Sequence, residues 1–122
     1  MSLRFLLDEQ LRGRLWHVIE RHNRVGACPL DVVCVGDPAD LPTGTPDPEI
    51  VLWAEREGRI LVSEDWSTML THFQARLAAG HRSPGLFLLR PLASLVDVVD
   101  FLAAAAYASD EREWVDVWRY IP

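Results

Sequence analysis

Acidic side chains follow two short apolar segments of this sequence, at the point where each segment ends. Residues 5–7 run directly into Asp8, and residues 60–62 run through a polar pair into Asp65. Such segments are typical of strands that are buried on both faces of a parallel sheet. Asp47 stands at the start of a predicted helix that leads into the second segment. Because ligands gather at the carboxyl ends of such strands, these aspartates are the candidate catalytic residues.

The chemistry expected of these aspartates is metal-dependent hydrolysis of phosphodiesters. If the strands that deliver Asp8 and Asp65 are neighbours, their carboxylates lie close together and repel each other. A divalent cation relieves that repulsion, and two or three carboxylates form the all-oxygen site that suits Mg²⁺ or Mn²⁺. Such an ion polarises a phosphodiester and generates hydroxide from bound water. Taken singly, each aspartate, Asp47 included, also fits the simpler role of a helix N-cap, which is worth about 1 kcal/mol.

Other polar residues are expected near the same sheet edge. Arg90 follows an apolar run at residues 86–89, where its guanidinium group suits either a substrate phosphate or a salt bridge to one of the acids. Ser63 precedes Asp65, and its hydroxyl either bonds to the backbone or orients a phosphate or a metal-bound water. His72 and His81 are expected at the surface and receive no catalytic role.

The chain as a whole predicts alternating strands and helices. Strands are expected at residues 4–7, 31–35, 59–62 and 86–89, with a candidate edge strand within 114–121. Helices are expected at residues 9–23, 47–57, 66–77 and 94–102, with Asp47 as N-cap of the second, and residues 36–46 form an irregular loop. Trp16, Trp53 and Trp66 fall on helical apolar stripes and are expected in the core rather than as platforms for base stacking. This alternation favours one α/β domain over residues 1–122, with a mostly parallel sheet of four to five strands between helix layers.

The composition limits the partners. The formal charge is −6, and all twelve basic residues are arginine, so non-specific binding to nucleic acid is not expected without an arginine patch or a metal ion. The spacing of Cys28 and Cys34 with His17 and His22 is wrong for a zinc finger, so we expect free thiols. The sequence shows no signal-peptide pattern and no apolar run long enough for a bilayer, so a cytoplasmic location without membrane contact is expected.

Four segments of the sequence resemble the short bacterial PIN-like nucleases that serve as toxins of toxin–antitoxin pairs. Residues 5–10 (FLLDEQ) are similar to the opening FLLDEN of that group, and Asp47, Ile50 and Ala54 match its spacing D-x-x-I-x-x-x-A. Residues 58–65 (GRILVSED) resemble GRVLVTRD, and residues 84–90 (PGLFLLR) resemble PGVILLR. Together these segments span most of the first ninety residues.

The resemblance implies a PIN-like three-layer α/β/α fold and a Mg²⁺- or Mn²⁺-dependent endoribonuclease. By position, Asp8, Asp47 and Asp65 would bind the metal. It also implies a cognate antitoxin protein and a homodimer as partners. The family usually carries a further aspartate in TRDKDF, where this sequence has Ser67 and Thr68. Larger PIN domains add a glutamate on an extra helix pair, for which Glu9 and Glu49 are the candidate substitutes here.

Two other functions stay open. A catalytically weak PIN-like protein that acts by binding a protein partner is consistent with the missing aspartate and with the net acidity. A phosphoacceptor receiver domain also places acids after the first and third strands of a parallel sheet. That class needs a lysine opposite the acids, and this sequence has none, so it ranks last.

Overall fold

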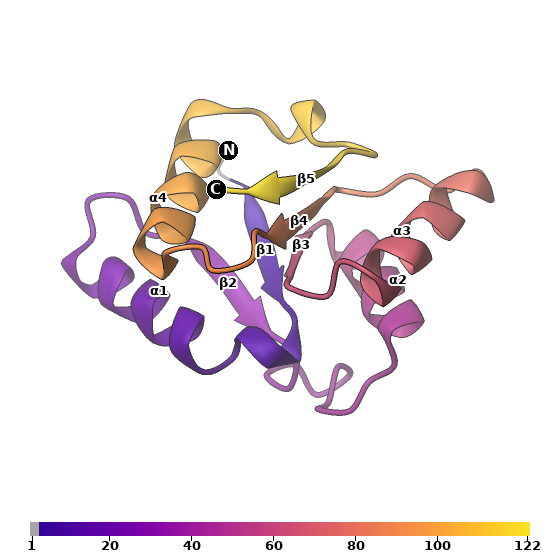
Figure 1. The fold of residues 1–122 in the computed structure, drawn as a ribbon, viewed down its shortest axis with the longest axis horizontal. Coiled ribbons are helices and arrows are strands. Elements are labelled where there is room, and N and C mark those ends of the chain that lie inside the picture. The colour runs from indigo at the N-terminus through magenta and orange to yellow at the C-terminus, as the bar shows by residue number, and fades with distance from the viewer. Residues whose placement is uncertain (1–2) are drawn as a thin grey trace.

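A single parallel sheet forms the centre of the computed structural model, which describes residues 3–122 (Figure 1). Its five strands are β1 (Arg4–Leu7), β2 (Asp31–Cys34), β3 (Ile60–Ser63), β4 (Leu86–Leu89) and β5 (Trp118–Ile121), in the spatial order β2-β1-β3-β4-β5. The helices are α1 (Arg14–Val25), α2 (Asp47–Glu57), α3 (Thr68–Ala78) and α4 (Leu95–Ala108), with short 3₁₀ turns η1 (Glu9–Leu11) and η2 (Glu111–Glu113). All four strand pairings are parallel.

The helices cover both faces of the sheet, so the fold has three layers (Figure 1). Successive residues of a strand point to opposite faces. Phe5 and Leu7 of β1 therefore belong to the core that packs against α1 and α4, whereas Leu6 belongs to the core under α2 and α3. This arrangement confirms the expected α/β class and the helix–sheet–helix layering. No helix of residues 3–122 has the length and apolarity needed to cross a lipid bilayer.

The two strands that precede the candidate acids are neighbours at the centre of the sheet. Leu6 of β1 is paired with Leu61 of β3, and Leu7 is paired with Val62. The backbone N–H of Asp8 continues this ladder and donates to the Val62 carbonyl at 2.9 Å. The residues that follow the strands therefore leave the sheet at the same level and at the same edge, as the sequence predicted.

Three helix starts differ from the expectation. The first helix is divided into η1 and α1 around Gly13, because glycine disfavours the helical conformation. Asp47 is the first residue of α2 rather than its N-cap, since the Ile50 N–H bonds to the carbonyl of the preceding Pro46 at 3.1 Å. The third helix starts at Thr68 instead of Trp66. The expected last edge strand is present as β5.

Gly58 sets the turn from α2 into β3. It ends α2 in the left-handed conformation, with φ 69°, and its N–H bonds back to the helix. A Cβ built there would lie 3.0 Å from Arg4 Nη2. We expect Gly58→Ala to cost about 1 kcal/mol of unfolding free energy, because an alanine is strained in this region. Urea unfolding measures the loss. Gly58→Asn should recover part of it, since asparagine tolerates the left-handed region, and equal stability of the alanine variant would contradict the geometry.

Candidate active site

Asp8 is the buried member of the candidate site. It is 4% exposed and lies directly after β1. Its carboxylate accepts a hydrogen bond from the Ser63 hydroxyl at 2.8 Å and another from the Glu9 backbone N–H at 2.8 Å, so it also caps η1. Burial raises the pKa of the Asp8 carboxyl, and the charges of Asp47 and Asp65 raise it further, against the two hydrogen bonds that lower it. The three carboxylates are therefore close enough to repel one another.

Ser63 joins Asp8 to the next part of the site. It is the last residue of β3 and is fully buried. Its hydroxyl donates to the Asp8 carboxylate and accepts from the Asp65 backbone N–H at 3.0 Å. The expected bond between this hydroxyl and the backbone is present, but the hydroxyl also holds the buried acid. Both functions of the hydroxyl are thus used inside the protein, so Ser63 positions Asp8 instead of presenting an open group to a substrate.

Asp65 lies in the turn between β3 and α3. One carboxylate oxygen accepts from the Ser67 N–H at 3.1 Å, from the Ser67 hydroxyl at 3.0 Å and from the Thr68 N–H at 3.0 Å. Its other oxygen contacts the Thr68 hydroxyl. These bonds lower the pKa of Asp65, with the Thr68 hydroxyl as the largest cause, so the carboxylate is ionised at neutral pH. The Asp65 side chain bonds to amides at the start of α3, but the N-cap residue of that helix is Ser67, so Asp65 is not the N-cap that the sequence offered. The Thr68 hydroxyl that its other oxygen contacts also bonds to Asp47.

Asp47 and Asp65 share that partner. The Thr68 hydroxyl lies 2.9 Å from Asp47 Oδ2 and also contacts Asp65 Oδ2. Asp47 is the first residue of α2, and its carboxylate meets Thr68, the first residue of α3. A hydroxyl has a single proton to donate, and it therefore cannot satisfy two carboxylates at once. This arrangement leaves an excess of negative charge that a cation would neutralise.

Thr68 is the site residue that the sequence reasoning missed. The sequence showed it only as a replacement for residues of the family motif. Thr68 comes three residues after Asp65, and an aspartate at that distance can bond to a residue in the first turn of a helix. This spacing was the signal available in the sequence. The link to Asp47 had no such signal, because it joins residues 21 positions apart on two different helices.

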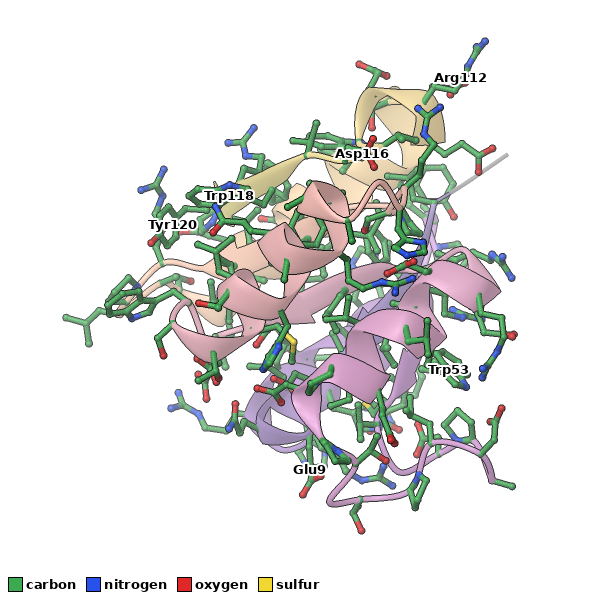
Figure 2. All side chains as sticks on the ribbon, turned by 90° about the vertical axis from the view of Figure 1, so that its right-hand side faces the viewer. Glu9, Trp53, Arg112, Asp116, Trp118 and Tyr120 are labelled. Carbon is green, nitrogen blue, oxygen red and sulfur yellow. The ribbon has the colours of Figure 1, made fainter. Side chains whose placement is uncertain are left out.

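The side chains of Glu9 and Glu49, the candidate substitutes for the missing ligand, contact other parts of the protein. The Glu9 carboxylate accepts from the Gly44 N–H at 2.7 Å, which ties η1 to the loop at residues 36–46. Glu49 is exposed and lines a different cavity, together with Asp40 and Trp53. Figure 2 shows Glu9 well away from Trp53. Neither glutamate is placed to complete a cluster with Asp8, so the sequence-based choice of Glu9 and Glu49 as extra ligands gains no support from the geometry.

Arg90 lies at the expected end of β4 but not in the expected salt bridge. Within residues 3–122 no Asp or Glu side chain forms an ion pair with it. Its Nε donates to the carbonyl of Pro122 at 3.2 Å, and its guanidinium carbon lies 5.8 Å from the centre of the Tyr120 ring. The interpretation of Arg90 as the salt-bridge partner of one of the acids is therefore wrong, and no acidic side chain occupies its guanidinium group at this edge of the sheet.

The carboxylate oxygens of the aspartates are the donors that a hard divalent cation prefers. In this structure, however, the carboxylates are not spaced to surround one ion. In the part of the chain that the structure describes, no three groups from His, Cys, Asp and Glu are arranged to hold a metal ion. The Thr68 hydroxyl stands between two of the carboxylates instead. The same finding applies to the four residues weighed for zinc, and burial raises the pKa of Cys34 to about 12, which keeps that thiol protonated.

We expect Ser63→Ala to destabilise the protein by about 1–3 kcal/mol at neutral pH, because the buried Asp8 carboxylate loses a hydrogen bond. The pKa of Asp8 should rise further, since that bond lowers it. When the pKa of a carboxyl is higher in the folded state than in the unfolded state, the protein loses stability at pH values above the folded-state pKa. Below the ordinary value of 3.8 the carboxyl is protonated in both states, so nothing is lost there. The destabilisation should therefore shrink on acidification. Urea unfolding over a pH series measures it, and a loss that is the same at acid and neutral pH would contradict this role.

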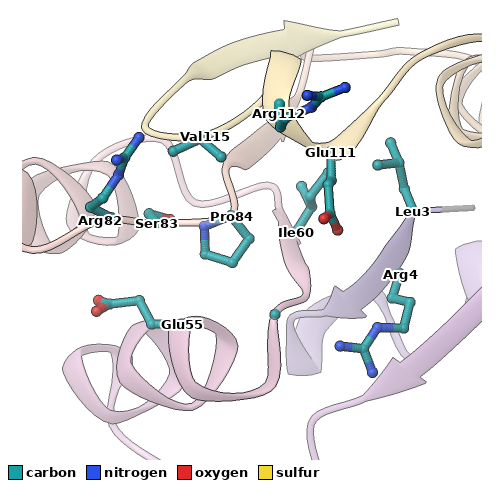
Figure 3. Close-up of a pocket in the computed structure, with 11 residues that line it drawn as sticks. Leu3, Arg4, Glu55, Ile60, Arg82, Ser83, Pro84, Glu111, Arg112 and Val115 are labelled. Atoms are coloured by element: carbon teal, nitrogen blue, oxygen red, sulfur yellow. The ribbon is translucent and has the colours of Figure 1, made fainter. Parts of the chain in front are cut away.

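A further cavity lies at the opposite edge of the sheet and takes no part in this site. It measures about 660 Å³, and its walls include Leu3, Ile60 and Pro84, which stand at the amino ends of β1, β3 and β4. Figure 3 shows Glu55 of α2 on one side of it and Glu111 of η2 on another. Because the aspartates follow the carboxyl ends of the strands, the sheet separates this cavity from the acids.

The family resemblance depends on segments that meet at the acidic site. Asp8, Asp47 and Asp65 come from three of the four segments, and the structure links them through two hydroxyl groups. Ser67 and Thr68, which replace family residues, both bond to Asp65. A comparison of the chain with protein-family models, with curated proteins and with solved structures gave no match, so membership of the PIN-like family stays a prediction.

Proposed function

We propose that this protein is a Mg²⁺- or Mn²⁺-dependent endoribonuclease of the PIN-like type and the toxin of a toxin–antitoxin pair. The observation that supports the nuclease proposal most strongly is the linked set of Asp8, Asp47 and Asp65 at the carboxyl edge of one parallel sheet. Residues far apart in the chain supply these acids, and the mutual repulsion of their carboxylates opposes folding. An arrangement that costs stability is typical of a functional site.

Each aspartate has a distinct part in this proposal. Asp65 is ionised and accessible, and Asp47 faces it across the Thr68 hydroxyl. Asp8 supplies a buried carboxylate whose orientation is fixed by Ser63. Together they would hold the divalent ion, which would supply a polarised phosphate and an activated water when bound. Arg90, which forms no ion pair with an Asp or Glu side chain of residues 3–122, would bind a phosphate of the RNA beside them.

Metal binding is expected to raise the melting temperature, because a ligand that binds only the folded state stabilises it. Mn²⁺ at a hundred times its dissociation constant would add about 2.7 kcal/mol. Scanning calorimetry with Mn²⁺ and with chelator measures the shift. Asp65→Asn should abolish the shift, whereas Asp100→Asn, an exposed aspartate on α4, should keep it. A wild-type melting temperature that is the same with and without Mn²⁺ or Mg²⁺ would contradict the proposed metal site.

Cleavage of RNA tests the reaction itself. The purified protein is incubated with total RNA and with a mixed-sequence single strand, in Mg²⁺, in Mn²⁺ and in chelator. Internal cleavage that needs the metal is expected. Cleavage that persists in chelator, or none under any of these conditions, would contradict the proposed activity.

A second candidate function is binding of a protein partner without turnover. The spacing of the acids favours it, because no three metal-binding side chains of residues 3–122 form a ready group. This candidate predicts a stable complex with the product of an adjacent gene and no nuclease activity with any metal. Co-purification of that product with active nuclease would instead fit a toxin held by its antitoxin. Size-exclusion chromatography of the protein alone tests the homodimer that the family resemblance implies.

A further inference from the structure

Trp66 is exposed beside the candidate active site. The sequence placed it in the core, but its side chain is 57% exposed in the turn between Asp65 and α3. The reason lies in the helix start. The Asp65 carboxylate bonds to the Ser67 and Thr68 amides, so the helix begins only after Trp66 and its apolar stripe does not include the indole. A large aromatic side chain is therefore held in solvent directly next to an acid of the site.

Trp66 is one wall of a cavity whose other walls are also suited to a flat ring. The cavity measures about 470 Å³ and is lined by Trp66, Arg90, Pro91 and Tyr120. This volume lies within the range of small-molecule sites, roughly 300–1,000 Å³. The Tyr120 ring packs edge to face against Trp118, with centroids 5.6 Å apart, and Figure 2 shows the two side by side. The rings of Trp66 and Tyr120, together with Pro91, thus provide apolar faces around the Arg90 guanidinium group.

Arg90 gives this cavity its charge. Its Nε donates to the main-chain oxygen of Pro122, and no Asp or Glu side chain of residues 3–122 forms an ion pair with it. An arginine that no acidic side chain pairs with, placed beside aromatic rings, suits a ligand that combines a flat apolar ring with an anionic group. In a chain of net charge −6, such a position would attract a phosphate to this edge of the sheet in particular.

We propose that this cavity binds a nucleotide of single-stranded RNA next to the cleavage site, with its base stacked on Trp66 and a neighbouring phosphate on Arg90. The inference rests on the proposed ribonuclease function, because it assigns a base-binding position to that substrate. Every base has a flat aromatic face, so stacking holds a single strand without selecting a sequence. A duplex keeps its bases stacked inside, so it cannot use the cavity.

Binding without cleavage tests this proposal. A fluorescein-labelled single-stranded RNA of mixed sequence is titrated with Asp8→Asn protein in chelator, and anisotropy reports the dissociation constant. Adding Trp66→Ala should weaken binding about tenfold, and Trp66→Phe should restore most of it. Arg90→Ala should reduce the slope of log affinity against log salt by about one, while Arg90→Lys should keep the slope. Tyr107→Ala, an exposed aromatic on α4, is the matched control and should change neither quantity.

The outcomes separate this proposal from the proposed function. Three results would overturn the base-stacking position. The first is equal affinity of the Trp66→Ala and parent proteins for the single strand, and the second is an equal loss of affinity for duplex RNA in Trp66→Ala. The third is the absence of any RNA binding. Cleavage of RNA by the wild-type protein with no effect of Trp66 on binding would overturn it alone. A tenfold effect on binding without any cleavage by the wild-type protein would support the stacking position and overturn the proposed nuclease. An effect of Trp66→Ala only on self-association would assign the surface to a second copy and overturn the proposal.

Discussion

Asp65→Asn is expected to reduce metal-dependent RNA cleavage by about a hundredfold or more, because it removes the one acid of the site whose pKa is lowered. Asparagine keeps an oxygen that can accept from the Ser67 and Thr68 amides, so the start of α3 should survive. The substitution therefore tests charge and not folding. Initial rates of cleavage at saturating Mn²⁺ measure the effect, and circular dichroism confirms the fold.

Asp8→Asn should cause a similar loss of activity, and it should keep or raise the stability of the protein. Asp8 is buried beside two other acids, and replacing its carboxyl group with a neutral amide removes the desolvation and repulsion that raise its pKa. We expect the melting temperature of Asp8→Asn to equal or exceed that of the wild type at neutral pH, because removing a strained functional charge often stabilises a protein. Asp100→Asn is the control for both properties. Full activity of either site variant would exclude that aspartate from the chemistry.

Phe87→Ala is expected to cost about 3–5 kcal/mol of unfolding free energy, which is a large part of the total for a domain of this size. Phe87 lies on β4 and is fully buried. Its ring centre lies 5.0 Å from that of Trp114, 5.5 Å from that of Phe101 and 6.2 Å from that of Phe5. It therefore joins two central strands, α4 and the segment before β5, and its removal leaves a cavity among all of them.

Urea unfolding measures the cost of the Phe87 substitution. Val96→Ala, at a side chain that is 58% exposed, should change the unfolding free energy by less than about 0.5 kcal/mol. Phe87→Leu should retain much of the stability, because it refills part of the volume. A loss below about 1 kcal/mol for Phe87→Ala would mean that the aromatic cluster does not join these elements as described.

The sequence predicted the elements that local periodicity determines. Residues 5–7 and 60–62 ran into acids, and the alternation of strands and helices predicted a mostly parallel sheet with the ends of these strands at one edge. It left open whether β1 and β3 are neighbours, which the structure shows that they are. The positions of Asp8 and Asp65 at one edge were therefore predictable. Their connection through Ser63 was not, because a buried hydroxyl has many alternative partners and only the register of β1 against β3 decides among them.

The exposure of Trp66 shows where periodicity fails. Its spacing from Met69 and Phe73 fits a helical stripe, and both of those residues are buried on α3. The Asp65 side chain competes with that pattern by bonding to the Ser67 and Thr68 amides, and this local bond moves the helix start past the indole. The spacing of apolar residues cannot reveal such competition between a side chain and the backbone. The candidate base-stacking surface therefore emerged only from the fold.

A crystal structure with Mn²⁺ tests the central claim most directly, because anomalous scattering locates the ion independently of the protein atoms. The account predicts one Mn²⁺ bonded to carboxylate oxygens of Asp65 and of at least one of Asp8 and Asp47, with the Thr68 hydroxyl displaced from between Asp47 and Asp65. An ion-free site at saturating Mn²⁺, with the Thr68 hydroxyl still between these two carboxylates, would contradict it.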